Sequence, residues 1–156
     1  MPSMTLAAVA LGSNEGDREK NLRGAIEAIG RIPKSRIGSV SGFIATPPAP
    51  PANRSDPAYL NGVALIETEL SVSDLHRDLQ AIEASFGRVR STPGAPRTLD
   101  LDLLLFGDAV VSTPTLTVPH PRMHERRFVL APLAAIAPTI RHPVLKRTAA
   151  ELLAAL

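Results

Sequence analysis

The sequence has no cysteine, and its 156 residues include only one tyrosine and four phenylalanines. Because cysteine is absent, the chain can form neither a disulfide nor a thiolate metal site, and its composition suits a reducing compartment. We therefore expect a cytoplasmic protein. Bases of single-stranded nucleic acid stack on aromatic side chains, which are scarce here, so the composition argues against nucleic-acid binding.

Long apolar runs are missing as well. No stretch of 18 or more apolar residues could span a bilayer, and the first residues lack the basic and apolar segments of a secretory signal, so we expect no membrane association. The formal net charge is only +2, and most of the cationic residues are arginine, which suits bidentate phosphate recognition. With 44% hydrophobic and 21% charged residues, the composition predicts one soluble domain over residues 1–156.

The most informative segment runs from Arg97 to Phe106, where leucines alternate with Asp100 and Asp102. In a strand every second side chain projects to the same face, so both carboxylates share one face and the intervening leucines can line a core. The two Cα atoms would lie about 7 Å apart, and the carboxylates would repel unless a cation lay between them. Mg²⁺ suits this place because it takes one or two carboxylates and completes its shell with water and phosphate oxygens. The alternative is a solvated strand face on which the aspartates have no function.

Cationic residues gather on both sides of this segment in the sequence. They are Arg88, Arg90, Arg97, His120, His124, Arg126 and Arg127. Carboxylates and guanidinium groups brought together in this way could hold an anion through a metal ion and arginine at once. His120 lies between two prolines in a rigid loop, and its neighbours favour a role beside phosphate over the alternative of a structural histidine.

Hydrophobic periodicity and turn residues predict an alternating order of strands and helices. We expect strands over residues 5–11, 37–44, 59–70 and 98–106, helices capped by Asp17 and Ser73, short strands near 110–118, and final helices over 128–136 and 147–156. The order βαββαβ predicts an α+β protein, a ferredoxin-like sandwich with a mainly antiparallel sheet and added C-terminal elements.

A proline-rich loop and two pairs of polar residues complete the candidate site. Five prolines within residues 46–57 exclude a helix or a central strand and predict an exposed binding loop. The following strand places Tyr59 and Asn61 on one face. On the next helix Gln80 and Glu83 lie three residues apart, away from the apolar stripe, and could touch one ligand; solvated side chains are the alternative.

Six short blocks of the sequence follow one another in a distinctive order. The most specific covers residues 94–104 and contains the aspartate pair. The others are residues 10–18, 46–48, 59–61, 82–90 and 118–128. In kind and order these blocks resemble the 6-hydroxymethyl-7,8-dihydropterin pyrophosphokinases of folate biosynthesis, and they span nearly the whole chain, from about residue 6 to residue 138.

The resemblance implies an enzyme that transfers the β,γ-diphosphate of ATP to the hydroxymethyl group of 6-hydroxymethyl-7,8-dihydropterin and releases AMP. It also implies the ferredoxin-like fold, ATP as co-substrate and two Mg²⁺ ions. We expect a monomer that binds small molecules rather than nucleic acid or membrane. Two other functions fit parts of the sequence. One is a Mg²⁺-dependent nucleotidyltransferase with a D-x-D site, and the other is a non-enzymatic ferredoxin-like module that binds RNA.

The resemblance also assigns roles to individual residues. It implies that Asp100 and Asp102 bind the metal ions and that Arg88 and Arg97 are catalytic. The implied ATP-binding residues are Gln80, Glu83, Arg90, Leu103, Thr117, His120, Pro121 and Arg126. The implied pterin-binding residues are Thr46, Pro47, Pro48, Ala49, Tyr59, Asn61 and Phe128, with Tyr59 and Phe128 as two stacking rings. The chain departs from the family pattern at Pro93 and Gly94, where a basic or aromatic residue is usual and the loop is about one residue shorter.

Overall fold

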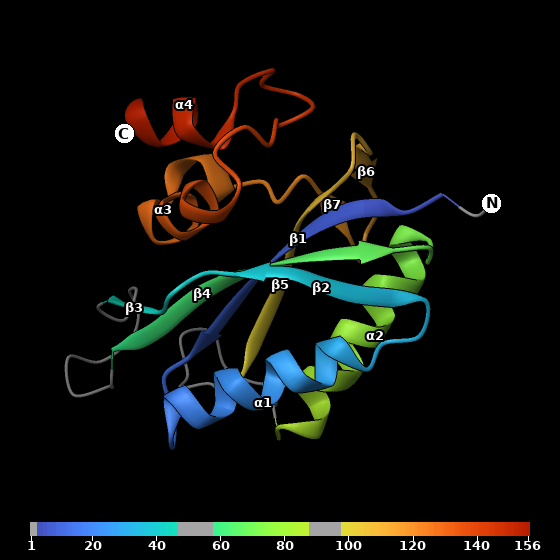
Figure 1. Ribbon diagram of the computed structural model, residues 1–156, viewed down its shortest axis with the longest axis vertical. Coiled ribbons are helices and arrows are strands. Elements are labelled where there is room, and N and C mark those ends of the chain that lie inside the picture. Colours follow the sequence, from blue (N-terminus) through green and yellow to red (C-terminus); the bar gives the residue numbers. More distant parts are fainter. Residues whose placement is uncertain (1–2, 47–57, 88–97) are drawn as a thin grey trace.

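The structure is a computed structural model, and it describes residues 3–46, 58–87 and 98–156 (Figure 1). In chain order the elements are β1 (Thr5–Ser13), α1 (Arg18–Gly30), β2 (Ser35–Val40), β3 (Ile44–Thr46), β4 (Tyr59–Thr68), α2 (Val72–Ser85), β5 (Asp100–Phe106), β6 (Val111–Ser112), β7 (Thr117–Val118), the 3-10 helix η1 (Met123–Glu125), α3 (Arg127–Ile136) and α4 (Ala149–Ala154). The predicted order of strands and helices is confirmed, with additional elements after β5.

The main sheet is antiparallel throughout. Its strand order is β2-β4-β1-β5, and β3 continues the pairing along β4 beyond the end of β2. The strands β6 and β7 form a separate two-stranded sheet. In the described residues β5 pairs with β1 alone, so one edge of the aspartate strand faces away from the sheet.

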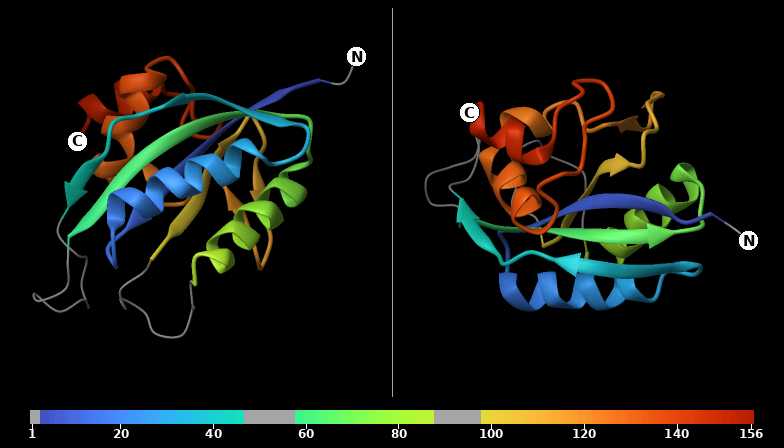
Figure 2. Two further views of the ribbon diagram at one scale, coloured as in Figure 1. Left: turned by 60° about the horizontal axis from the view of Figure 1, so that its bottom comes forward. Right: turned by 45° about the horizontal axis from the view of Figure 1, so that its top comes forward.

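Each face of the main sheet is covered by helices and carries its own hydrophobic core. Helices α1 and α2 lie on one face, while α3 and α4 lie on the other (Figures 1 and 2). The first core includes Leu22, Ile29, Leu75, Leu79, Leu99, Leu101 and Leu103, and the second includes Val63, Leu104, Leu105, Met123, Leu130, Leu133 and Leu152. The leucines between the aspartates therefore line the α1–α2 core, as the alternation predicts.

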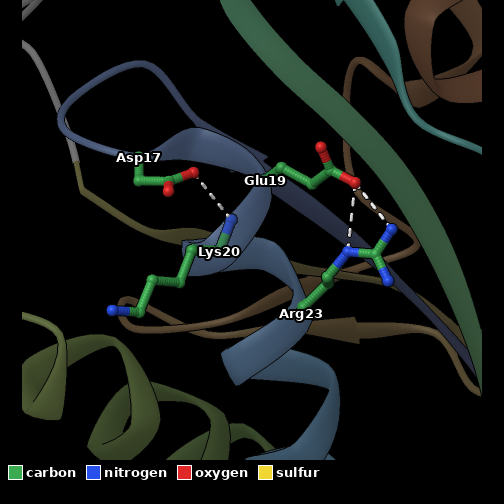
Figure 3. Close-up of polar contacts among 4 residues, drawn as sticks. All are labelled: Asp17, Glu19, Lys20 and Arg23. Atoms are coloured by element: carbon green, nitrogen blue, oxygen red, sulfur yellow. Dashed lines mark hydrogen bonds and ion pairs between the residues drawn. The ribbon is translucent and has the colours of Figure 1, made fainter.

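The first helix begins where the sequence indicates. The carboxylate of Asp17 accepts a hydrogen bond from the backbone N–H of Lys20 at 3.1 Å (Figure 3). This N-cap satisfies one of the backbone donors that a helix leaves unpaired in its first turn. Glu19 and Arg23 add an exposed ion pair at 2.6 Å, worth only about 0.3–0.5 kcal/mol, so the cap matters more than the pair.

The cap predicted for the second helix is wrong by two residues. Ser71, and not Ser73, is the N-cap, because its hydroxyl accepts from the backbone N–H of Asp74 at 3.1 Å. With Ser71 in this role, Asp74 falls at the third helical position, where a carboxylate also interacts well with the positive end of the helix. Serine is a good N-cap at either position, but only Ser71 has an acidic residue, Asp74, three positions later.

The predicted strand over residues 37–44 is interrupted. The structure has β2 up to Val40 and β3 from Ile44, because Ser41 pairs with β4 through its side chain. The Ser41 hydroxyl accepts from the N–H of Val63 at 2.9 Å, and the N–H of Ser41 donates to the carbonyl of Val63 at 2.9 Å. The side chain thus replaces one rung of the ladder and bends the chain toward β3.

The first strand is longer than predicted. The sequence predicts a strand over residues 5–11, but β1 continues through Gly12 and Ser13, which pair with β4. This extension places Gly12 inside the sheet rather than in a loop.

Over the described residues, no helix combines the length and the apolar character needed to cross a bilayer.

Two histidines, His124 and His142, lie together in the C-terminal part of the chain. His142 is only 6% exposed, and its Nδ1 accepts from the backbone N–H groups of Val144 at 3.2 Å and Leu145 at 3.1 Å. Its ring meets that of His124 edge-on, with centroids 6.3 Å apart. Burial, and then the neighbouring charge of His124, lower the pKa of His142 from its ordinary value of 6.5.

We expect this lowered pKa to make the protein less stable in acid. The unfolded chain takes up a proton at His142 more readily than the native protein, so stability falls as the pH drops below 6.5 and stops falling below the native pKa. The His142→Asn variant keeps an acceptor near Nδ1 but does not titrate there. Its thermal midpoint should depend less on pH between about 7 and 5, and an unchanged slope would contradict the role given to His142.

Candidate active site

The two aspartates of β5 project from the face that α3 covers. Asp100 pairs across the ladder with Gly12, and Asp102 pairs with Ala10. Directly paired residues share a face, and Ala10 packs against the core beneath α3. Both aspartates are half-buried. The carboxylates therefore lie on one face, at the border between the sheet and solvent.

A ring and an amide lie on the other side of β1. On β4, Asn61 pairs with Gly12 and Tyr59 pairs with Thr46 of β3. Asn61 is 7% exposed, and its Nδ2 donates to the hydroxyl of Thr46 at 2.8 Å. Three of the predicted pterin-binding residues are thus brought together, and Thr46 orients the amide.

Gly12 lies between these two groups. It pairs with Asn61 on one side and with Asp100 on the other, so the two groups are separated by two strand spacings, or about 10 Å. A Cβ atom at Gly12 would stand 3.3 Å from Asn61 Oδ1 and 3.5 Å from Tyr59 Cδ1. The missing side chain keeps the surface between the amide and the carboxylates open.

His120 is tied to the aspartate strand through its backbone. Its N–H donates to the carbonyl of Leu104 at 3.0 Å, and its Nδ1 accepts from the N–H of Arg122 at 3.2 Å. The neutral ring therefore carries its proton on Nε2. Burial, then Arg126, lower the pKa of His120 from 6.5; Asp100 opposes this change and Arg122 adds to it. At neutral pH the ring is an uncharged hydrogen-bond donor close to Asp100 and Arg126.

Arg126 and Phe128 lie at the start of α3. The guanidinium carbon of Arg126 is 5.7 Å from the centroid of the Phe128 ring, within the range of a cation–π contact. Phe128 is half-buried against the core beneath α3. One end of this helix therefore supplies both an arginine and an aromatic ring to the face that carries the aspartates.

The remaining predicted ATP-binding residues differ in their exposure. Gln80 is exposed on α2, and Thr117 and Pro121 are exposed around β7. Leu103 is 4% exposed and packs in the α1–α2 core. The expectation that Glu83 lies away from the apolar stripe of its helix is wrong, because Glu83 is buried together with Leu75 and Leu79.

Six predicted site residues lie outside the part of the chain that the structure describes. They are Pro47, Pro48, Ala49, Arg88, Arg90 and Arg97. Their roles stay predictions. Both predicted catalytic arginines are among them. The described residues contain part of the three other groups: the ring and amide for the pterin, the acidic pair for the metal, and His120 with Arg126 for phosphate.

The acidic pair fits Mg²⁺ in its chemistry. The described residues hold no group of three or more histidines, aspartates, glutamates or cysteines that could enclose a metal ion by themselves. Asp100 and Asp102 offer two hard carboxylate ligands, and Mg²⁺ commonly takes one or two such ligands and fills its octahedron with water and substrate phosphates. A two-carboxylate site is therefore suited to a metal that arrives with a nucleotide.

Sequence reasoning missed the position of Gly12 and the burial of Glu83. For Gly12 a signal was present, because a glycine stands at the end of an apolar strand and directly before Ser13 and Asn14. Its neighbours, however, depend on the register of β1 against both β4 and β5. No local pattern in the sequence specifies that register.

The βαββαβ order, with α1 and α2 together on one face of an antiparallel sheet, makes the chain a ferredoxin-like α+β protein. Its two groups of site residues suit an enzyme that joins two small substrates. Residues 8–138 match the family described as 7,8-dihydro-6-hydroxymethylpterin-pyrophosphokinase. The chain belongs to this family.

Curated relatives agree with this assignment. The 2-amino-4-hydroxy-6-hydroxymethyldihydropteridine pyrophosphokinase of Pseudomonas aeruginosa is 46% identical over 86% of this chain and 82% of its own. The enzyme of the same name from Bacillus subtilis is 43% identical over 84% of this chain and 77% of its own. The predicted family, the enzyme class and a pyrophosphokinase function in folate biosynthesis are confirmed. The comparisons support neither the nucleotidyltransferase nor the RNA-binding alternative.

Solved structures bear on the fold alone. A crystal structure of HPPK-DHPS with substrates aligns with a TM-score of 0.71 and 12% identity, and covers 97% of this chain and 43% of that chain. The wild-type Plasmodium falciparum HPPK-DHPS with pterin and p-hydroxybenzoate aligns with a TM-score of 0.73 and 13% identity, over 99% of this chain and 43% of that chain. The chain thus spans less than half of these larger proteins, and the predicted ferredoxin-like α+β fold is confirmed.

Proposed function

We propose that the protein transfers the β,γ-diphosphate of ATP to the hydroxymethyl group of 6-hydroxymethyl-7,8-dihydropterin and releases AMP. The family match over residues 8–138 and the relatives above 40% identity support this reaction. The observation that carries it is the arrangement around Gly12, with Asn61 on one side and Asp100 on the other. An acceptor on β4 and a nucleotide on β5 would meet there.

The pterin would bind at Tyr59 and Asn61. An aromatic ring stacked on the pterin contributes about 0.5–1.5 kcal/mol beyond the burial of surface, and Phe128 is proposed as the second ring. Thr46 accepts from Nδ2 of Asn61 and so holds the amide in one orientation. The amide can then recognise the polar edge of the pterin, while the residues of the proline-rich loop are proposed to bind its other polar atoms.

The phosphates of ATP would bind beside β5. Two Mg²⁺ ions held by Asp100 and Asp102 would neutralise charge on the phosphate oxygens and polarise the reacting phosphorus. Neutral His120 can donate from Nε2 to a phosphate oxygen, and Arg126 brings a permanent positive charge nearby. Arg88 and Arg97 are proposed to steady the triphosphate from the segment before β5.

The transfer needs no covalent intermediate on the protein. The hydroxyl oxygen of the pterin attacks the β-phosphorus and loses its proton, while the bond from that phosphorus to the bridging oxygen breaks and AMP leaves with the electron pair. The protein must hold the two substrates in line and balance the developing charge. Correct positioning alone can remove about 7–11 kcal/mol from such a barrier.

Several properties of the whole molecule belong to the same proposal. We propose a single catalytic domain that acts as a cytoplasmic monomer and binds no nucleic acid. The lack of cysteine supports a reducing compartment, and the scarcity of aromatic residues argues against a base-stacking surface. Gel filtration with light scattering would test the monomer directly.

Incubation with ATP, Mg²⁺ and 6-hydroxymethyl-7,8-dihydropterin tests the reaction. We expect AMP and the pterin diphosphate in equal amounts, and no AMP when the pterin is omitted. Release of free diphosphate would instead indicate nucleotidyl transfer, and release of ADP would indicate transfer of a single phosphoryl group. Either result would overturn the proposed function.

A further inference from the structure

Glu83 is a residue of α2 whose carboxylate contacts the backbone of β5, the strand that carries the two aspartates. It is 2% exposed, and among the residues that the structure describes it is the one buried acidic side chain. Its Oε2 accepts a hydrogen bond from the backbone N–H of Leu101 at 2.7 Å. A hydrogen bond to a carboxylate is stronger than one between neutral groups, and burial removes the competition of water.

The partner of this carboxylate is the residue between the two aspartates. Within the described residues β5 pairs only with β1, so its outer edge has no neighbouring strand to bond its backbone. Glu83 takes the N–H of Leu101 at this edge, and the N–H of His120 reaches the carbonyl of Leu104. Glu83 and His120, two predicted site residues, therefore each make one of the backbone hydrogen bonds that a neighbouring strand would otherwise make to β5.

We propose that Glu83 is a positioning residue that holds Asp100 and Asp102 at the spacing the metal requires. The backbone angles of Leu101 set the relative directions of the side chains on either side of it. Without an outer partner, an edge strand can twist at this residue. Loss of a residue that holds metal ligands in place typically lowers metal affinity by 10- to 100-fold. If the backbone at Leu101 were no longer fixed, we therefore expect metal binding to weaken.

This role differs from the direct ATP contact that the family resemblance implies for Glu83. A residue that touches the nucleotide affects nucleotide binding, whereas a positioning residue affects the Leu101 amide even when no nucleotide is present. The metal consequence rests on the proposed function, but the effect on the amide does not. Measuring both separates a failure of this inference from a failure of the proposed reaction.

The experiment compares Glu83→Leu, which removes the acceptor, with Glu83→Gln, which keeps an acceptor oxygen of the same reach. Ala81→Leu is the matched control, because Ala81 is exposed on the same helix. Amide hydrogen exchange at Leu101, measured by NMR without nucleotide, should be at least about 10-fold faster in Glu83→Leu and nearly unchanged in the control. Glu83→Gln should lie close to the wild type.

Metal binding is measured in the same variants. The affinity for Mn²⁺, determined by calorimetry with a non-hydrolysable ATP analogue, should fall about 10- to 100-fold in Glu83→Leu and be largely restored in Glu83→Gln. The KM for the pterin should stay within about twofold. If Glu83→Leu does not fold, the chemical shift of the Leu101 amide decides the question, because the neutral acceptor of Glu83→Gln should shift this signal although the exchange rate stays close to that of the wild type. Unchanged exchange and metal affinity in a folded Glu83→Leu, or an unshifted Leu101 amide signal in Glu83→Gln, would overturn the inference.

Discussion

Replacing Asp102 with alanine is expected to lower kcat/KM at least about 1,000-fold while the fold is retained. Metal ions contribute several kcal/mol of charge stabilisation to phosphoryl transfer, and 1,000-fold corresponds to about 4 kcal/mol. Asp100→Ala should have a similar effect, because the pair offers only two carboxylates and each is needed to share the charge of the nucleotide-bound metal. Titration of Mg²⁺ against initial rate in each variant measures this loss.

The fold should survive these substitutions because the strand is held by its backbone and its leucines. Thermal unfolding should therefore remain cooperative in both variants. Asp108→Asn is the matched control, since Asp108 is exposed in the turn that follows β5 and should leave turnover unchanged. Metal-independent activity in an Asp100→Ala, Asp102→Ala double variant would refute the metal role of the pair.

The alternation of leucine and aspartate was sufficient to predict how β5 lies in the protein. A period of two has only one arrangement in which the leucines are buried, and that arrangement puts both aspartates on the opposite face. The first helix and its Asp17 cap were predictable for a similar reason, because they depend on residues within a few positions of one another. Local chemistry determines these features, and the sequence displays it directly.

The features that sequence reasoning missed depend on partners far along the chain. Glu83 follows Leu79 by four residues and Leu75 by eight, so it is in register with the apolar stripe, but a carboxylate favours solvent unless it has a buried partner. Its partner, the N–H of Leu101, is 18 residues away and is available because β5 is an edge strand. Ser41 likewise replaces a rung of the ladder opposite Val63, 22 residues away. Tertiary pairing decides such cases, and no local propensity encodes it.

Gly12→Val is expected to raise the KM for the pterin and lower kcat/KM by about 5- to 150-fold, the equivalent of 1–3 kcal/mol of overpacking. The backbone of Gly12 does not need glycine, because its φ lies outside the left-handed region. The damage is therefore steric. Even the Cβ of alanine would stand 3.3 Å from Asn61 Oδ1, and the larger valine would also enter the space through which the two substrates meet. Binding of an ATP analogue, measured separately by calorimetry, should change much less.

The smaller substitution Gly12→Ala tests the steric cause. Gly38→Ala is its control, because Gly38 lies on β2 and an added Cβ would approach only the carbonyl of Leu65, at 3.8 Å. A double-mutant cycle identifies the cause. If the contact with the amide is responsible, Gly12→Ala should cost little in an Asn61→Ala background, whereas independent effects would simply add. Equal losses of ATP and pterin binding in Gly12→Val would show that the glycine supports the whole sheet and not the meeting point of the substrates. A selective loss of pterin binding would place that meeting point on β1, between the amide and the aspartates.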